Sequence, residues 1–263
     1  MTTMIFYERA VALNRERHQK LKLQLKANHF SFAAKTNSVL LAGSEFAEAS
    51  RDYPIVFVGK EGGPFTLAAL VGLGEKDNLM VDEKGLWEPN SYIPAFIRRY
   101  PFVLAGGEGA ESLTVCVDEA YPGLNEETGE ELFNSDGTET TYLKKVIEFL
   151  VLFHSEMKRT ALFAEKMSEL GLLTSKVVTI EREGSKQTLE GAWVIDETKL
   201  NALDDKTMLE LVRTGYLGWI YAHLMSLNNV TRLARRMDVR RITSAPASEA
   251  AAADDGADKA VIH

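Results

Sequence analysis

The chain has 263 residues, of which 45% are hydrophobic and 26% are charged, and its formal net charge is −8 at pH 7. This composition is typical of a globular protein that buries a full core, in one large domain or in two halves that share an interface. The negative charge disfavours non-specific contact with nucleic acid or anionic membranes, so we expect no nucleic-acid partner. The single cysteine, Cys116, excludes a disulfide framework and a thiolate metal site.

Residues at the start of the chain give no export signal. Glu8 and Arg9 interrupt the sequence before an apolar run of signal-peptide length has formed. The longest uncharged apolar run, residues 64–74, is shorter than the ~20 residues that a membrane-spanning helix needs. We therefore expect a cytoplasmic protein without membrane insertion, with leaderless export to the cell surface as the alternative.

Residues 1–120 are predicted to form a β-rich half. Leu21, Leu23 and Leu25 alternate with polar residues as in a strand, and residues 43–51 favour a short helix. The spacing of the strands predicts an antiparallel meander or a partly open barrel. Further strands are predicted from short apolar runs bounded by turn residues, at 29–34, 38–42, 54–58, 65–73, 102–104 and 113–117.

Residues 138–236 are predicted to form a helical half. Apolar residues recur at intervals of three and four up to Leu170, so we expect a long helix with Asp136 or Thr138 as its N-cap. Gly171 is expected to end this helix.

A β-hairpin and a second long helix are predicted after it. The hairpin pairs residues 173–181 with 187–195, and the helix covers about 204–236. The Ala-rich residues 241–263 are expected to be a disordered tail. The predicted fold class is therefore a single α+β domain at 1–240, whose β half packs on two long C-terminal helices with a hairpin between them.

Charge is distributed unevenly along the chain. Residues 9–26 and 232–241 are basic, whereas residues 108–139 contain many carboxylates and no Lys or Arg. A solvated acidic loop and a basic helix C-terminus explain these segments structurally. Alternatively, a basic segment meets the acidic loop of a neighbouring molecule, which favours a homo-oligomer.

Motifs for catalysis or for metal binding are weak. The sequence contains neither a P-loop nor a Gly-x-Ser-x-Gly elbow. His154, Glu156 and His223 imitate the two-His, one-carboxylate set of non-haem iron oxygenases. His154 and Glu156 lie two apart in a helical pattern, where their side chains point in different directions, so we interpret the match as accidental. No catalytic residue, metal site or cofactor is predicted.

Residues 87–102 (WEPNSYIPAFIRRYPF) are the most specialised stretch of the chain. Three prolines restrict the backbone, so the aromatic side chains have little conformational freedom left to lose on binding. Arginines beside aromatic rings are suited to a peptide, an amino acid or a partner protein, through stacking and carboxylate contacts. The alternative is an aromatic plug between the two halves, with both arginines paired to internal acids. The candidate ligand-binding residues are Trp87, Tyr92, Phe96, Arg98, Arg99 and Tyr100.

Three passages resemble the bacterial SapC family, namely residues 53–57 (YPIVF), 92–102 (YIPAFIRRYPF) and 221–227 (YAHLMSL). The resemblance covers about residues 4–236. It implies a role associated with surface layers, and similar genes often lie near flavin-dependent halogenases and outer-membrane receptors. The resemblance brings no catalytic residues. We therefore predict a non-enzymatic binding or assembly protein, with an enzyme or accessory protein of amino-acid or peptide modification, linked to a halogenase or oxygenase, as the alternative.

Overall fold

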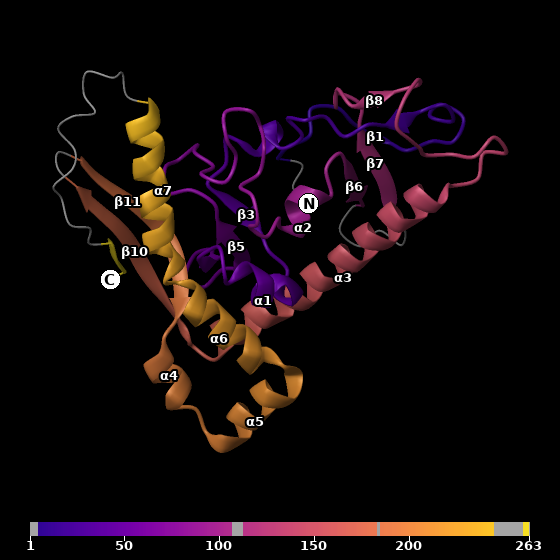
Figure 1. Ribbon diagram of the computed structural model, residues 1–263. Helices are drawn as coiled ribbons and strands as arrows, with labels where there is room; N and C mark the ends of the chain where they lie inside the picture. Colours follow the sequence, from indigo (N-terminus) through magenta and orange to yellow (C-terminus); the bar gives the residue numbers. More distant parts are fainter. Residues whose placement is uncertain (1–4, 107–112, 183–184, 245–259, 263) are drawn as a thin grey trace.

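The computed structural model describes residues 5–106, 113–182, 185–244 and 260–262 (Figure 1). It is a mixed α+β fold in which every strand pair is antiparallel and the sheets are not closed into a barrel. The predicted fold class is thereby confirmed. Among the described residues, no helix combines the length and the apolar composition needed to cross a membrane.

The largest sheet has six strands in the order β12-β10-β11-β4-β5-β3. Its hairpin, β10 with β11, confirms the predicted pairing, and β4 is joined to β11 through Phe57 and Trp193. The strands are β3 (Ser38–Leu40), β4 (Ile55–Val58), β5 (Thr66–Leu70), β10 (Leu173–Arg182), β11 (Ser185–Ile195) and β12 (Ala260–Ile262).

Two smaller sheets come from the rest of the first half. One has the order β1-β7-β6 and the other β8-β2-β9, so residues from the basic 9–26 segment pair with strands from the acidic 108–139 segment. The strands are β1 (Ala10–Ala12), β2 (Lys22–Leu23), β6 (Phe102–Ala105), β7 (Thr114–Asp118), β8 (Leu124–Asn125) and β9 (Glu130–Glu131).

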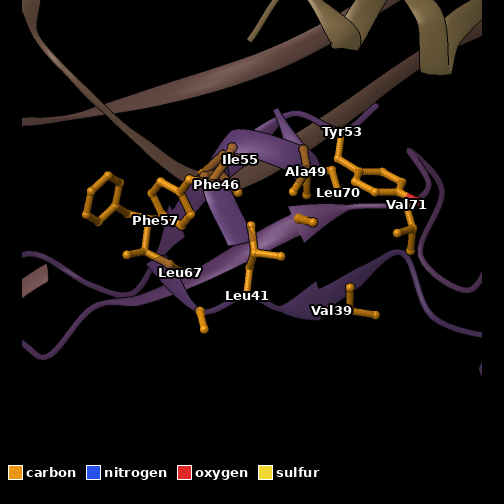
Figure 2. Packing of buried hydrophobic residues seen from close by; sticks show 14 of the residues in the cluster. Val39, Leu41, Phe46, Ala49, Tyr53, Ile55, Phe57, Leu67, Leu70 and Val71 are labelled. Atoms are coloured by element: carbon orange, nitrogen blue, oxygen red, sulfur yellow. The ribbon is translucent and has the colours of Figure 1, made fainter. Parts of the chain in front are cut away.

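Buried apolar residues form two clusters, here called the first core and the second core. The first core lies at β3, β4 and β5 of the large sheet and contains Phe46, Tyr53 and Phe57, part of which Figure 2 shows. The second core lies at β6 and β7 and contains Phe102 and Leu143.

One long helix, α3 (Thr141–Glu169), joins the two cores. Figure 1 shows it running from the β6–β7 sheet to the short helix α1 (Phe46–Ala49). Its buried side chains recur mainly at steps of three and seven, which places them on one face, with Leu143 in the second core and Phe163 in the first. The helix begins after Thr140, whose hydroxyl accepts a hydrogen bond from the Leu143 N–H, so the predicted caps lie a few residues too early.

The second predicted helix, 204–236, is wrong as a single element. The structure divides it into α5 (Asp205–Thr214), α6 (Tyr216–Ser226) and α7 (Asn229–Ser244), preceded by the short α4 (Glu197–Asn201). Gly215 has φ 78°, a left-handed conformation that ends α5 and that glycine adopts without a steric penalty. The apolar periodicity continues across this break, which is why the sequence pattern does not reveal it.

Two other predicted segments differ from the structure. Residues 29–34 do not form a strand, because Ser31–Ala33 form a single 3-10 turn, η1. The predicted short helix at 43–51 consists of a 3-10 turn, η2 (Gly43–Glu45), followed by α1. In the predicted tail, α7 continues to Ser244 and β12 pairs with β10, while 245–259 and 263 lie outside the described residues.

The contact between η2 and α6 leaves no room for a side chain at Gly43. A Cβ atom there would lie 2.4 Å from the Trp219 ring, so we expect Gly43→Ala to displace the ring and to lower the free energy of unfolding by about 1–3 kcal/mol. Chemical denaturation measures this loss. Gly218→Ala on α6 is the control, because its Cβ would meet nothing and alanine favours helix. Equal stability of both variants would contradict the packing described here.

Candidate functional site

The segment from Trp87 to Phe102 crosses from the first core to the second. Trp87 and Phe96 are buried in the first core, and Tyr100 and Phe102 are buried in the second. Its helix α2 (Ala95–Arg98) packs beside β3, and the Tyr100–Pro101 peptide bond is cis. Most of the predicted ligand-binding side chains therefore lie inside the protein, at the place where the 87–102 segment joins its two cores, here called the junction.

Trp87 and Tyr92 are hydrogen-bonded to Tyr53 and Asp52, which lie just before β4 of the large sheet. The Trp87 Nε1–H donates to the Tyr53 hydroxyl at 3.2 Å, and this hydroxyl donates in turn to the Tyr92 carbonyl oxygen. The Tyr92 N–H donates to the Asp52 carboxylate at 2.9 Å. These bonds fix the backbone of the segment against the residues around Tyr53.

Glu45 is a buried carboxylate under Tyr92 that the sequence analysis does not single out. It accepts hydrogen bonds from the Tyr92 hydroxyl at 2.8 Å, the Ala95 N–H at 2.7 Å and the Ala42 N–H at 3.0 Å. Burial raises its pKa, while these three hydrogen bonds and the charge of Arg98 act in the opposite direction. In the sequence, Glu45 lies three residues after Ala42, the N-cap of η2, and a glutamate at this position commonly accepts the N–H of the N-cap residue.

Arg99 lies within the junction. Its guanidinium carbon is 4.0 Å from the centre of the Phe96 ring, and the rings of Tyr7 and Phe153 lie within 6 Å. Burial lowers the pKa of Arg99, and the neighbouring Tyr7 raises it. The side chain is 7% exposed, so it is not accessible to an external ligand in this conformation.

Arg98, by contrast, is exposed, and its side chain is held in one orientation. The Nε–H donates to the Ile93 carbonyl at 2.9 Å, and Nη2 donates to the Tyr92 hydroxyl at 3.2 Å. The guanidinium carbon is 5.2 Å from the centre of the Phe149 ring on α3 and 5.8 Å from that of Tyr92. Of the six predicted residues, Arg98 and the half-buried Tyr92 are those that reach the surface.

The other two passages of family resemblance meet beside this segment. His223 on α6 is fully buried, its Nδ1–H donates to the Ile55 carbonyl at 2.8 Å, and its Nε2 accepts the Ile195 N–H at 3.1 Å. The Ser226 hydroxyl accepts the Ile55 N–H at 2.9 Å. Asn229 donates to the Tyr53 carbonyl at 3.2 Å. Helix α6 and the start of α7 are thus bonded to β4 and to the residues just before it.

Both nitrogens of His223 are used in these hydrogen bonds, so neither has a free lone pair for a metal ion. The suggested set of His154, Glu156 and His223 is therefore not a metal site, in agreement with the interpretation as accidental. The described residues contain no group of three or more His, Cys, Asp or Glu that could hold a metal ion.

The basic segments form ion pairs within the chain. Each pair joins two segments that are distant in sequence, so these contacts reinforce the tertiary structure. The pairs are Lys22–Glu131 at 3.0 Å, Arg17–Glu119 at 2.7 Å, Arg236–Glu88 at 2.8 Å and Arg240–Asp77 at 3.0 Å.

Asp118 is a second buried carboxylate that the sequence analysis missed. It is fully buried at the end of β7 and accepts hydrogen bonds from the N–H groups of Glu8, Arg9 and Ala120 and from the Tyr100 hydroxyl, at 2.9–3.2 Å. It thereby ties the start of the chain to the junction. The sequence feature that could have pointed to Asp118 is its position directly after the predicted strand at 113–117.

Two of the hollows in the described part of the chain lie along α3. One, of about 480 Å³, lies near the start of α3 and is lined by Leu13, Phe133 and Ile147, among others. The other, of about 460 Å³, lies between Phe65 and the second half of α3. None of the residues of the 87–102 segment lines either hollow.

The fold and the junction together define a mixed α+β protein whose two cores are joined by one aromatic segment and one long helix. The three passages that hold this junction are the ones that resemble the SapC family. The SapC family model matches residues 13–233, which is most of the chain, so the protein belongs to the SapC family. Neither the curated proteins nor the solved structures give a match to the chain.

Proposed function

We propose that the protein is a non-enzymatic binding protein that takes the carboxylate of a peptide, an amino acid or a partner protein at Arg98. The observation that carries this proposal is that Arg98 is both exposed and held in place. An ordered arginine loses little side-chain entropy when it binds, which favours affinity.

The hydrogen bonds of Arg98 leave its outer edge open. A guanidinium has five N–H donors, and here one N–H of Nε and one of Nη2 are used by the protein. The remaining donors belong to Nη1 and Nη2, which are the pair that binds a carboxylate through two parallel hydrogen bonds. No acceptor among the described residues bonds to Nη1.

The accessible groups around Arg98 favour binding over catalysis. Burial and the neighbouring Glu45 raise the pKa of Tyr92 to about 12, so its hydroxyl keeps its proton at neutral pH. Phe149 supplies an aromatic face. The surface-layer association and the link to a modification enzyme remain predictions of the family resemblance.

The test is a titration of the ¹⁵N-labelled protein with N-acetyl-Ala-Leu carrying a free carboxylate, followed by NMR. We expect this peptide, but not its C-terminal amide, to shift the resonances of α2. Arg98→Gln should weaken binding about tenfold or more, because a charge-assisted hydrogen bond contributes ~1.5–3 kcal/mol.

Arg213→Gln is the matched control, because Arg213 is an exposed arginine on α5, away from the segment. It should bind as the wild type does. Arg98→Lys keeps the charge and loses the paired donors, so its affinity should lie between the two. Equal binding of the acid and the amide, or unchanged binding by Arg98→Gln, would refute the proposal.

A further inference from the structure

A row of side chains continues from Arg98 along one side of α3. Phe149, Leu152, Glu156 and Arg159 follow one another at spacings of three and four, which places them on one side of the helix, here called the α3 flank. Leu152 is 62% exposed, so an apolar side chain lies open between the two ends. Arg159 lies ten positions after Phe149, a rise of ~15 Å along the helix.

Arg159, at the far end of the α3 flank, resembles Arg98 in its setting. Its guanidinium carbon lies 4.6 Å from the centre of the Trp219 ring, as Arg98 lies against Phe149. Its side chain is 48% exposed. Within the described residues it donates no hydrogen bond, and its ion-pair partner, Glu156, lies 3.8 Å away, beyond hydrogen-bond distance. Its N–H donors are therefore open to a ligand.

Glu156 lies between the two arginines and has an unsatisfied oxygen. Its Oε2 is buried and accepts no hydrogen bond from the described residues, although the side chain as a whole is 21% exposed. Buried polar atoms without a partner are rare in folded proteins. The negative charge of Glu156 thus lies on the α3 flank between the two arginines.

We propose that Arg98 and the α3 flank together dock an extended segment of a partner protein that carries two carboxylates four residues apart and an apolar residue midway between them. This inference rests on the proposed carboxylate site at Arg98 and extends it by a second one. Along an extended chain, residues i, i+2 and i+4 point to one side, and i and i+4 lie ~13 Å apart, close to the rise between Phe149 and Arg159.

The charges of the α3 flank select this occupant over a nucleic acid. A peptide can carry its negative charge at two acidic side chains alone, so that the neutral part of the chain between them lies at the Glu156 carboxylate. A phosphate backbone carries a negative charge at every nucleotide and would bring one against this carboxylate. In a helical segment residues i and i+4 rise by only ~6 Å, which is too little for the two carboxylates to reach both arginines.

The experiment measures fluorescence anisotropy with a fluorescein-labelled peptide, Gly-Gly-Glu-Ser-Leu-Ser-Glu-amide. Two further peptides have glutamine in place of the first or of the last glutamate. We expect the peptide with two acids to bind at least tenfold more tightly than either peptide with one. Arg159→Gln should reduce its affinity to that of the single-acid peptides, and Arg213→Gln should leave it unchanged.

The outcomes separate this inference from the proposed function. If Arg98→Gln weakens binding and Arg159→Gln does not, the extension along the α3 flank is wrong and the Arg98 site stands. If neither substitution changes the affinity, both proposals are wrong. If an unlabelled thymidine oligonucleotide displaces the peptide at equal concentration, the occupant is a phosphate backbone and the peptide inference is overturned.

Discussion

His223→Gln is expected to remove a large part of the acid sensitivity of the protein. The wild type should lose about 3 kcal/mol of unfolding free energy through His223 alone as the pH falls from 6.5 to about 4. The variant should not show this loss, because glutamine does not titrate. Its amide can still donate to the Ile55 carbonyl and accept the Ile195 N–H, the two bonds that the imidazole makes.

The direction follows from the environment of the ring. Burial lowers the pKa of His223 to about 4, while its hydrogen bond to Ile55 acts in the opposite direction. In the unfolded chain the imidazole takes up a proton near pH 6.5, its ordinary pKa. Below that pH the unfolded state therefore binds more protons than the folded state, so stability is full above pH 6.5 and falls as the pH approaches 4.

Urea denaturation of both proteins at several pH values from 7.5 to 4 measures this effect. The pH dependence contributed by Glu45, His29 and other titrating groups is common to both and cancels in the difference. His223→Ala is a useful companion, because it leaves the Ile55 carbonyl and the Ile195 N–H without partners and should cost about 3–5 kcal/mol at pH 7.5. Parallel stability curves for wild type and His223→Gln would show that the ring is not buried as described.

Asp118→Asn should destabilise the protein by about 3 kcal/mol or more and should loosen the start of the chain. The carboxylate accepts from the backbone N–H groups of Glu8, Arg9 and Ala120 and from the Tyr100 hydroxyl. An amide replaces one acceptor oxygen by an NH₂ group, which faces N–H donors and leaves them unpaired in a buried place.

Two measurements check this prediction. Chemical denaturation gives the loss of stability, and hydrogen exchange should be faster for the amides of β1, which pairs with β7 beside Asp118. Asp136→Asn is the matched control, because Asp136 is exposed and bonds only to the neighbouring Thr138, so its loss should be much smaller. Unchanged hydrogen exchange of the β1 amides in Asp118→Asn would contradict the role of Asp118 in holding the N-terminal segment.

The two substitutions act at opposite ends of one junction. His223 bonds the large sheet to α6, and Asp118 bonds the N-terminal segment to Tyr100. The aromatic segment lies between them and contributes to both cores. Most of its specialised composition is therefore explained by packing, and of the six predicted ligand-binding residues only Arg98 and Tyr92 reach the surface.

Some elements could be predicted from the sequence because their signals are local. The apolar residues at three and four between Leu143 and Met167 specify α3, and the two β-branched runs around residue 184 specify the β10–β11 hairpin. The break at Gly215 was missed, because apolar periodicity records which residues face a core and not whether the helix axis is continuous.

The sequence by itself determined the α+β class, the order of the main elements and the family, because these depend on patterns among neighbouring residues. Only the tertiary structure decided the roles of Arg98 and Arg99. They are adjacent in the chain and chemically identical, yet Arg99 is enclosed by rings from distant segments while Arg98 projects beside Phe149 into solvent. Consecutive residues of a helical turn point ~100° apart, so which of the two is covered depends on where α3 and the N-terminal segment pack.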